Sequence, residues 1–241
     1  MTKVAEHKRI VKNFFNPLEL KAINWMIPRL PSWVSSDMMT LLGIFSAGLV
    51  CVSYWLSRFN PLWLWMASFG LVLHWLGDSL DGNIARVRKR LRPHYGFFID
   101  HTSDTLAMVL IFVGIGLSPY ARLDAALIVL ISYLCMSIIV YVRTIIEGVF
   151  EFTFGKVGPT EMRFITILMN AWLFFFKNPE VRLLESIGRI TYLDVFGLVI
   201  AAVFFVTFVV SMLKYGIIYA RRDTEQLNKD NPPKTGARRG R

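Results

Sequence analysis

Residues 61–117 read PLWLWMASFGLVLHWLGDSLDGNIARVRKRLRPHYGFFIDHTSDTLAMVLIFVGIGL, and this stretch decides the fold. Two apolar blocks, residues 61–82 and 97–117, lie on either side of a short basic turn. Each block is long enough to cross roughly 30 Å of hydrocarbon as a helix. The stretch therefore predicts two adjacent membrane-spanning helices, with aspartates where the two helices meet the turn.

The same pattern extends outward over most of the 241 residues, of which 54% are hydrophobic. Apolar blocks alternate with charged segments, which is typical of a polytopic membrane protein and excludes a soluble enzyme. Four further blocks of spanning length lie near residues 38–57, 122–146, 161–177 and 193–217. We therefore expect an all-α membrane protein with six transmembrane helices.

Residues 1–36 differ from these blocks because charged and apolar side chains alternate at helical spacing. This predicts an amphipathic helix that lies in the membrane interface, with packing on another protein domain as the alternative. The predicted domains are the interfacial segment 1–36, the six-helix domain 37–220 and a basic, disordered tail 221–241. The apolar face consists of Val11, Phe14, Phe15, Leu18, Ala22, Trp25 and Met26.

The positive charges predict the orientation. The segments on the side of the N-terminus hold 22 of the 27 Lys and Arg residues, so both termini are expected in the cytoplasm. This placement accounts for the net charge of +10, and no nucleic-acid partner is needed to explain it. Cys51 and Cys135 both fall inside apolar blocks, so no disulfide framework is predicted.

Four aspartates interrupt the two central helices. Asp78 and Asp81 are three residues apart and Asp100 and Asp104 are four apart, so each pair projects from one helix face. A carboxylate inside hydrocarbon costs at least about 2.5 kcal/mol, and four that converge would repel one another unless cations lie between them. An all-oxygen cluster suits Mg²⁺ or Mn²⁺, and four carboxylates can bridge two such ions. For any single aspartate, snorkelling at the helix end or an ion pair is the alternative.

Arg86 and several small residues accompany the acidic pairs. Arg86 follows Asp81 by about one turn, and its guanidinium can hold a diphosphate bidentately. We interpret Gly77 as a helix-packing contact and Gly82 as a position where a ligand approaches the backbone closely. Ala85 and Gly96 complete the set of small residues near the aspartates.

The motif from Asp78 to Asp104 resembles the signature of the CDP-alcohol phosphotransferase family: two aspartates, Gly, Ala-Arg, a spacer, Gly and two more aspartates. The six-span layout with an interfacial helix is also similar to that family. All eight fixed positions match: Asp78, Asp81, Gly82, Ala85, Arg86, Gly96, Asp100 and Asp104.

The resemblance implies a homodimer with a cytoplasm-facing polar cavity in each subunit. In each cavity the four aspartates would hold two divalent ions, Mg²⁺ or Mn²⁺, and the diphosphate of a CDP-linked donor would bind to those metals. The cytidine would lie against Gly82, Ala85 and Arg86, with Gly96 nearby. An alcohol would then attack the β-phosphorus, and CMP would leave.

Two further stretches resemble the choline and ethanolamine phosphotransferase branch. Residues 30–34 with 40–43 are similar to the entrance of its first span, and residues 98–101 with 158–161 to its Asp-His and Thr-Glu elements. By this resemblance His101 is the base that activates a lipid hydroxyl and Glu161 orients it, whereas Asp104 is the base favoured elsewhere in the family.

Three functions fit these residues. The first is transfer of a phosphoalcohol from a CDP-alcohol to a lipid hydroxyl such as diacylglycerol, which His101 and Glu161 favour. The second is transfer of a phosphatidyl group from CDP-diacylglycerol to a small polar alcohol, for which six spans are common. The third is cation transport, which lacks support because no polar route continues through the outer halves of the second and third spans.

Overall fold

The computed structural model describes residues 8–9, 15–150, 158–176, 180–181 and 190–230. It confirms the all-α class, because helices account for nearly all of these residues. A short helix, α1 (Asn16–Met26), continues into the 3₁₀ turn η1 (Ile27–Arg29). Six long helices follow: α2 (Ser36–Leu56), α3 (Trp63–Val87), α4 (Pro93–Leu117), α5 (Leu123–Glu147), α6 (Pro159–Phe176) and α7 (Tyr192–Asp230).

The described strands are two residues each and do not alter this class. β1 (Lys8–Arg9) pairs in parallel with β2 (Val149–Phe150), with Lys8 opposite Val149. β3 (Glu180–Val181) pairs antiparallel with β4 (Ile190–Thr191), with Glu180 opposite Thr191.

Each of the six predicted spans is a helix in the structure. Four of them, α2, α4, α5 and α7, are long and apolar enough to cross a membrane. α3 and α6 do not reach that measure, so the described residues contain four candidate spans by length and composition, where the sequence predicted six. Helices suit this setting because each satisfies its own backbone hydrogen bonds.

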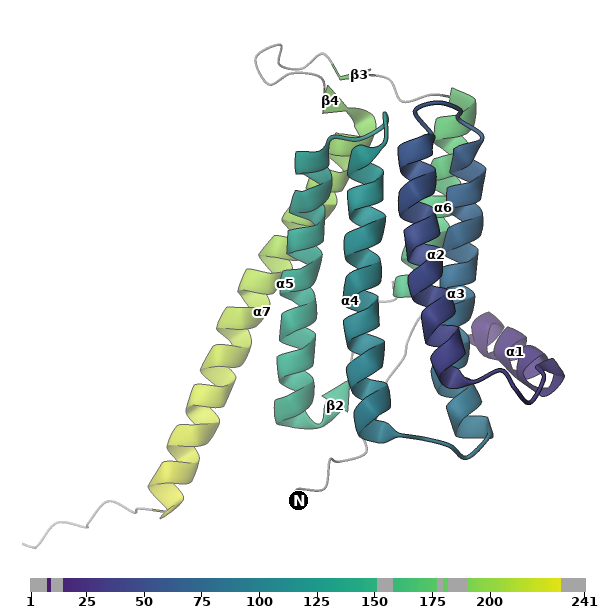
Figure 1. The fold of residues 1–241 in the computed structure, drawn as a ribbon. Coiled ribbons are helices and arrows are strands. Elements are labelled where there is room, and N and C mark those ends of the chain that lie inside the picture. The colour runs from purple at the N-terminus through teal and green to yellow at the C-terminus, as the bar shows by residue number, and fades with distance from the viewer. Residues whose placement is uncertain (1–7, 10–14, 151–157, 177–179, 182–189, 231–241) are drawn as a thin grey trace, which may run out of the picture.

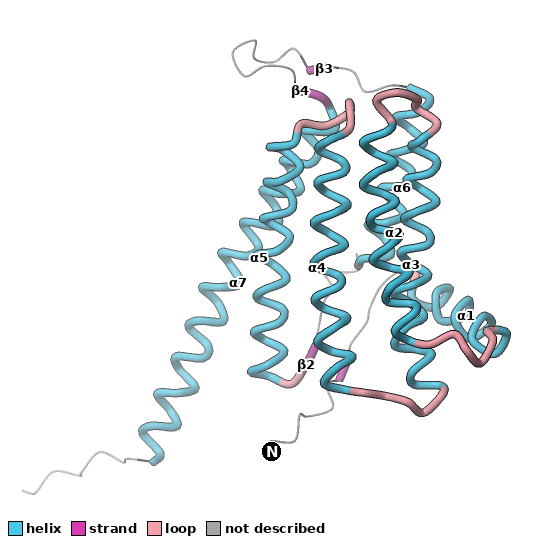
Figure 2. Tube along the Cα trace, in the orientation of Figure 1, coloured by secondary structure: helices cyan, strands magenta, loops and turns pink. Residues whose placement is uncertain are grey.

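The long helices form two groups that meet at α2 and α4. α3 packs against α2 and α6, whereas α5 packs against α4 and α7, as Figures 1 and 2 show. A buried hydrogen-bond network joins the first group: the Tyr54 hydroxyl donates to Asn170 Oδ1 over 2.7 Å, and Asn170 Nδ2 donates to Ser68 Oγ over 3.1 Å. These bonds satisfy polar groups that hydrocarbon would leave unpaired.

Local sequence explains where these helices begin and end. The Ser35 side chain accepts from the Met38 N–H and caps α2, and prolines open α4 and α6. α5 ends at Gly148, whose φ of 70° is a left-handed conformation that favours glycine.

α1 lies crosswise beside the lower part of α3 (Figure 1). Its Ile23 is buried with Leu80 and Ile84 of α3, whereas Leu18 and Trp25 are 64% and 60% exposed. The helix therefore has one apolar face on the protein and a second that faces outward, as an interfacial helix requires. The predicted apolar residues Val11 and Phe14 lie outside the described residues.

The prediction of a disordered tail from residue 221 is wrong over its first ten residues. α7 continues through Arg221 and Arg222 to Asp230. Arg, Glu, Gln and Lys are good helix formers, and the first helix-breaking residue is Pro232. Residues 231–241 lie outside the described part of the chain.

Gly77 permits the closest approach of α2 and α3. A Cβ placed on Gly77 would lie 2.6 Å from the Met39 carbonyl oxygen and 2.7 Å from the Gly43 nitrogen. Both are backbone atoms that cannot turn away as a side chain would. The interpretation of Gly77 as a helix-packing contact is therefore confirmed.

We predict that Gly77→Ala lowers the melting temperature of the detergent-solubilised protein by roughly 5 °C, because the added methyl forces α2 and α3 apart. Gly48→Ala is the matched control, since a Cβ there meets no atom within 4 Å. It should leave the melting temperature unchanged or raise it, because alanine is the better helix former. Equal effects of the two substitutions would contradict the close-packing account.

Candidate active site

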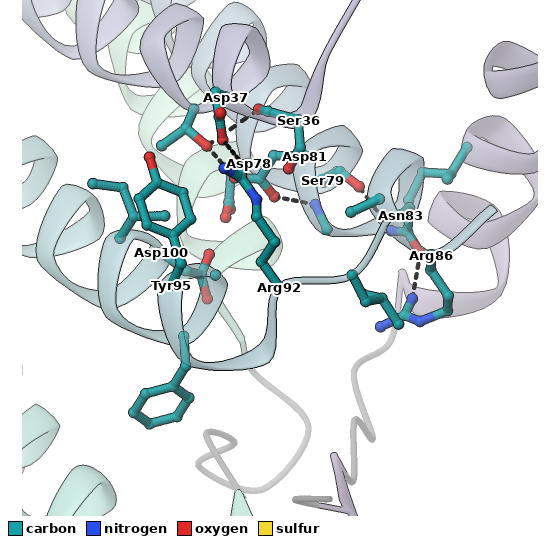
Figure 3. Close-up of a pocket in the computed structure, with 18 of the residues that line it drawn as sticks. Ser36, Asp37, Asp78, Ser79, Asp81, Asn83, Arg86, Arg92, Tyr95 and Asp100 are labelled. Carbon is teal, nitrogen blue, oxygen red and sulfur yellow. Dashed lines mark hydrogen bonds and ion pairs between the residues drawn. The ribbon is translucent and has the colours of Figure 1, made fainter. Parts of the chain in front are cut away.

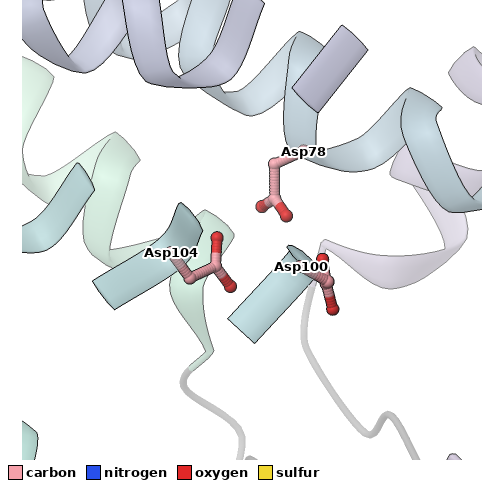
Figure 4. Close-up of side chains that lie close together, drawn as sticks. All are labelled: Asp78, Asp100 and Asp104. Atoms are coloured by element: carbon pink, nitrogen blue, oxygen red, sulfur yellow. The ribbon is translucent and has the colours of Figure 1, made fainter. Parts of the chain in front are cut away.

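Three carboxylates converge between the facing ends of α3 and α4. Asp78 comes from α3, and Asp100 and Asp104 lie one turn apart on α4, so all three point into the same space (Figure 4). One oxygen from each lies within 4.8 Å of the others. Such a set of hard oxygen atoms fits a divalent cation of the Mg²⁺ type.

The fourth predicted ligand, Asp81, lies beside this cluster and faces α2. Its Oδ2 accepts a hydrogen bond from the Thr40 hydroxyl over 2.9 Å, and its Oδ1 accepts from the Gly82 N–H. The side chain is buried and lines the same cavity as Asp78 and Asp100. The structure thus brings three of the four aspartates within ligand distance of one another and places the fourth next to them.

Sequence analysis missed a buried arginine in the site. Arg163 of α6 donates from Nη2 to Asp78 Oδ2 over 2.6 Å, and its side chain is only 9% exposed. The sequence treated Arg163 as one more positive charge at the cytoplasmic end of a span. A Lys or Arg one turn inside a predicted helix is the signal that would have singled it out.

A cavity of about 350 Å³ opens over the aspartates (Figure 3). A methyl group placed on Gly82 or Gly96 would meet no atom within 4 Å, so both backbones are open to a ligand. Arg86 lines the cavity and donates to Asn83 Oδ1 over 2.8 Å. The lining comes from α1, α2, α3, α4 and α6 and includes Glu19, Thr40, Asp78, Asp81, Gly82, Ala85, Arg86, Gly96, Asp100 and Arg163.

An ion pair crosses the mouth of this cavity. Arg92, in the turn between α3 and α4, pairs with Asp37 at the start of α2, and its guanidinium lies 4.2 Å from the centre of the Tyr95 ring. All three residues line the cavity (Figure 3). They tie α2 to α4 at the end where the cavity opens.

His101 lies on α4 next to Asp100. Its ring stacks on Phe97 with centroids 4.2 Å apart and lies 4.8 Å from the Tyr141 ring. Its Nδ1 is 3.4 Å from Asp100 Oδ2. His101 is thus adjacent to Asp100, a candidate metal ligand.

Glu161 has different neighbours from those expected. Its two carboxylate oxygens accept hydrogen bonds from the backbone N–H groups of Phe15, over 3.0 Å, and Gly158, over 2.9 Å. The second of these bonds caps the start of α6. The bonds described for Glu161 therefore join α6 to the N-terminal segment, and they do not bring it to His101.

Glu19 of α1 makes a second connection of this kind. Its carboxylate accepts from the Ser79 hydroxyl over 2.6 Å and from the Thr160 hydroxyl over 3.1 Å. Ser79 directly follows Asp78, so α1 is bonded to the segment that carries the acidic motif. α1 is therefore one wall of the cavity.

Arg88 holds the chain between α1 and α2. Its guanidinium donates to the backbone carbonyls of four residues: Leu30, Pro31, Ser32 and Val34. Sequence analysis counted Arg88 only among the positive charges that predict the orientation. Every residue has a backbone carbonyl, so nothing in the sequence marks these four acceptors, and the sequence alone could not reveal the role of Arg88.

The combination of six long helices, an acidic cluster and a glycine-lined cavity defines a class of membrane protein. A sequence profile of the CDP-alcohol phosphatidyltransferase family matches residues 33–209, which is well over half of the chain. The chain belongs to this family, and it is an integral membrane protein.

Three curated relatives show how the similarity is distributed. Cholinephosphotransferase 1 of Bos taurus is 27% identical over 157 residues, which cover 60% of this chain and 37% of the bovine protein. Cholinephosphotransferase 1 of Danio rerio is 25% identical over 183 residues, covering 70% of this chain and 46% of the fish protein. Phosphatidylinositol phosphate synthase of Cutibacterium acnes is 36% identical over 84 residues, covering 35% of this chain and 38% of the bacterial protein. The matches span less than half the length of each relative.

We predict that Arg88→Lys destabilises the protein, because a lysine ammonium cannot reach four carbonyls with the planar fork of a guanidinium. Loss of two or three such bonds should lower the free energy of unfolding by about 1–3 kcal/mol, read as a lower melting temperature in detergent. Arg90→Lys is the matched control, two residues along in the same turn. An equal loss in both variants, or no loss in either, would contradict a specific role of the Arg88 contacts with the four carbonyls.

Proposed function

We propose that this protein transfers a phosphoalcohol from a CDP-alcohol to a lipid hydroxyl such as diacylglycerol and releases CMP. The observation that carries the proposal is the convergence of Asp78, Asp100 and Asp104, of which Asp78 and Asp100 line an open cavity. Family membership and the similarity to two cholinephosphotransferases support the choice of reaction.

The aspartates are the proposed metal ligands. Asp78, Asp100 and Asp104 present oxygens close enough to share an ion, and we propose that Asp81, which lines the same cavity as Asp78 and Asp100, joins a second ion. Two Mg²⁺ or Mn²⁺ ions bound here would neutralise the donor diphosphate and stabilise the leaving oxygen. The chain's own contribution is to hold four carboxylates on two helices at one depth.

The donor would bind in the cavity above these carboxylates. Gly82 and Gly96 leave space at the backbone for the nucleotide, and Ala85 adds a small wall. Arg86 lines the same space and can turn from Asn83 to a phosphate oxygen, which a guanidinium binds bidentately. A cavity of about 350 Å³ is within the range of small-molecule sites.

The chemical step needs a base. The acceptor oxygen bonds to the β-phosphorus, the bond from that phosphorus to the bridging oxygen breaks, and the hydroxyl proton passes to a protein group. His101 and Asp104 are the two candidates. His101 is positioned by Phe97, Tyr141 and Asp100, and we propose it as the base because an imidazole next to a carboxylate accepts a proton readily.

The contacts of Glu161 suggest a role different from the one its sequence motif implied. Through Phe15 it holds the N-terminal segment against α6, close to the cavity wall. We therefore propose that Glu161 affects the reaction through the placement of α1 and α6, and that it does not orient His101 directly.

The location and assembly of the enzyme are also proposals. The Lys and Arg distribution favours a cavity that opens to the cytoplasm, with both termini on that side. We expect a homodimer, as the family resemblance implies, and a lipid acceptor that enters from the surrounding membrane.

One observation favours a second donor class. The bacterial relative named phosphatidylinositol phosphate synthase has a higher identity, 36%, over a shorter stretch. Transfer of a phosphatidyl group from CDP-diacylglycerol to a polar alcohol would use the same aspartates and cavity. The two reactions differ in which substrate carries the lipid.

We predict that Asp78→Asn, Asp81→Asn and Asp100→Asn each lower the rate of CMP release by at least about 100-fold, because each change removes a metal ligand and its charge. EDTA should abolish the activity of the wild-type protein, and Mg²⁺ or Mn²⁺ should restore it. Asp124→Asn, an exposed carboxylate paired with Arg122, is the matched control and should stay active. Full CMP release after exhaustive chelation would contradict the metal site.

We predict that His101→Ala lowers kcat by roughly 100-fold or more with little change in the donor KM, the usual scale for general acid–base catalysis. The measurement is steady-state CMP release with a CDP-alcohol and diacylglycerol. If His101→Ala keeps most of its activity while Asp104→Asn is inactive, Asp104 is the base. That result would favour CDP-diacylglycerol as the donor.

A further inference from the structure

Arg163 is a cation buried within a site that is built to bind cations. It enters from α6, opposite α3 and α4, and forms an ion pair with Asp78 Oδ2 over 2.6 Å. It also interacts electrostatically with Asp104 and with the buried His74, and it lines the cavity over the aspartates. The Arg163 guanidinium therefore occupies one side of the space in which these carboxylates would bind a metal ion.

The bonding of Arg163 is incomplete for a buried arginine. Its Nε is buried and has no hydrogen-bond partner among the residues that the structure describes. Burial of a guanidinium is costly unless its donors are paired, so this arrangement is not the one that a purely structural ion pair would favour. This arrangement is expected of an arginine whose N–H groups bond to other acceptors in a second state of the site.

Charge balance indicates what that other state is. Asp78, Asp100 and Asp104 repel one another in a half-buried site without a cation, and Arg163 offsets part of that repulsion. A divalent ion does the same more effectively, and it would draw on the same Asp78 carboxylate, one oxygen of which Arg163 holds. The guanidinium and the ion therefore compete for one ligand.

We propose that Arg163 is a resident cation that holds Asp78 when no metal is bound and gives up this carboxylate to the divalent ion. The inference deepens the proposed function and rests on the metal site assigned there. Once released, the guanidinium stays in the cavity, where the donor phosphates offer it bidentate acceptors. Arg163 thus positions Asp78 in the empty site and becomes a second arginine, with Arg86, that faces the donor.

The test is direct titration of Mn²⁺ into the purified protein in detergent, without nucleotide, with free Mn²⁺ read by electron paramagnetic resonance. We expect Arg163→Gln to bind Mn²⁺ about 5- to 10-fold more tightly than the wild-type protein, because a charge-assisted hydrogen bond no longer competes for Asp78. Arg90→Gln is the matched control, since Arg90 lines the same cavity and no ion pair is described for it. It should shift the affinity by less than about 2-fold, because an exposed charge outside the cluster is screened.

Unchanged or weaker Mn²⁺ binding by a folded Arg163→Gln protein would overturn the inference, as would an equal gain in Arg90→Gln. If Arg163→Gln does not fold, Arg163→Lys decides the question, because a lysine keeps the charge but loses the planar fork. Its Mn²⁺ affinity should exceed that of the wild-type protein, and an equal or lower affinity would contradict the competition. A wild-type protein that binds no Mn²⁺ would instead contradict the metal site of the proposed function, and the inference with it.

Discussion

The repulsion among the half-buried carboxylates of α3 and α4 is the constraint on which the rest of this structure depends. Asp78, Asp100 and Asp104 point into one space within apolar helices, where unbalanced charge is most costly. Each neighbouring element supplies something that makes this arrangement stable: α6 provides Arg163, and α2 provides Thr40 as a hydrogen-bond donor to Asp81. The cavity next to the cluster leaves room for the phosphates of the proposed donor.

Packing fixes the geometry that this constraint requires. Gly77 lets α2 approach α3 until backbone contacts backbone, which places Thr40 against Asp81. Glu19 bonds the interfacial helix to the residue after Asp78, and Arg88 holds the chain that leads from that helix into α2. The first helix is therefore part of the cavity wall, and its outward face exposes Leu18 and Trp25.

The sequence predicted those features that arise from local spacing. Apolar blocks predicted the helices, and spacings of three and four residues predicted that the aspartates share helix faces. The interpretation of Gly77 as a packing residue also follows from its place in an apolar helix. The continuation of α7 to Asp230 was missed because charged residues were taken as the end of a helix, although they end only its apolar part.

Contacts between distant segments were not predictable in this way. Arg163 and Asp78 are 85 residues apart, and Phe15 and Glu161 are 146 apart, so no periodicity links them. The motif similarity assigned Glu161 to His101, but its hydrogen bonds depend on how the N-terminal segment returns to α6. Arg88 binds carbonyl groups, which every residue has, and its partners therefore leave no trace in the sequence.

The central claim is that the acidic cluster serves transfer from a CDP-linked donor, and radiolabel transfer tests it most directly. Purified protein with Mg²⁺ or Mn²⁺ would be supplied in turn with labelled CDP-choline, CDP-ethanolamine and CDP-diacylglycerol, each with its acceptor. We predict that label from a CDP-alcohol appears in a phospholipid, with one CMP released for each lipid formed. If folded protein that binds the metal transfers label from none of the three donors, the account is contradicted.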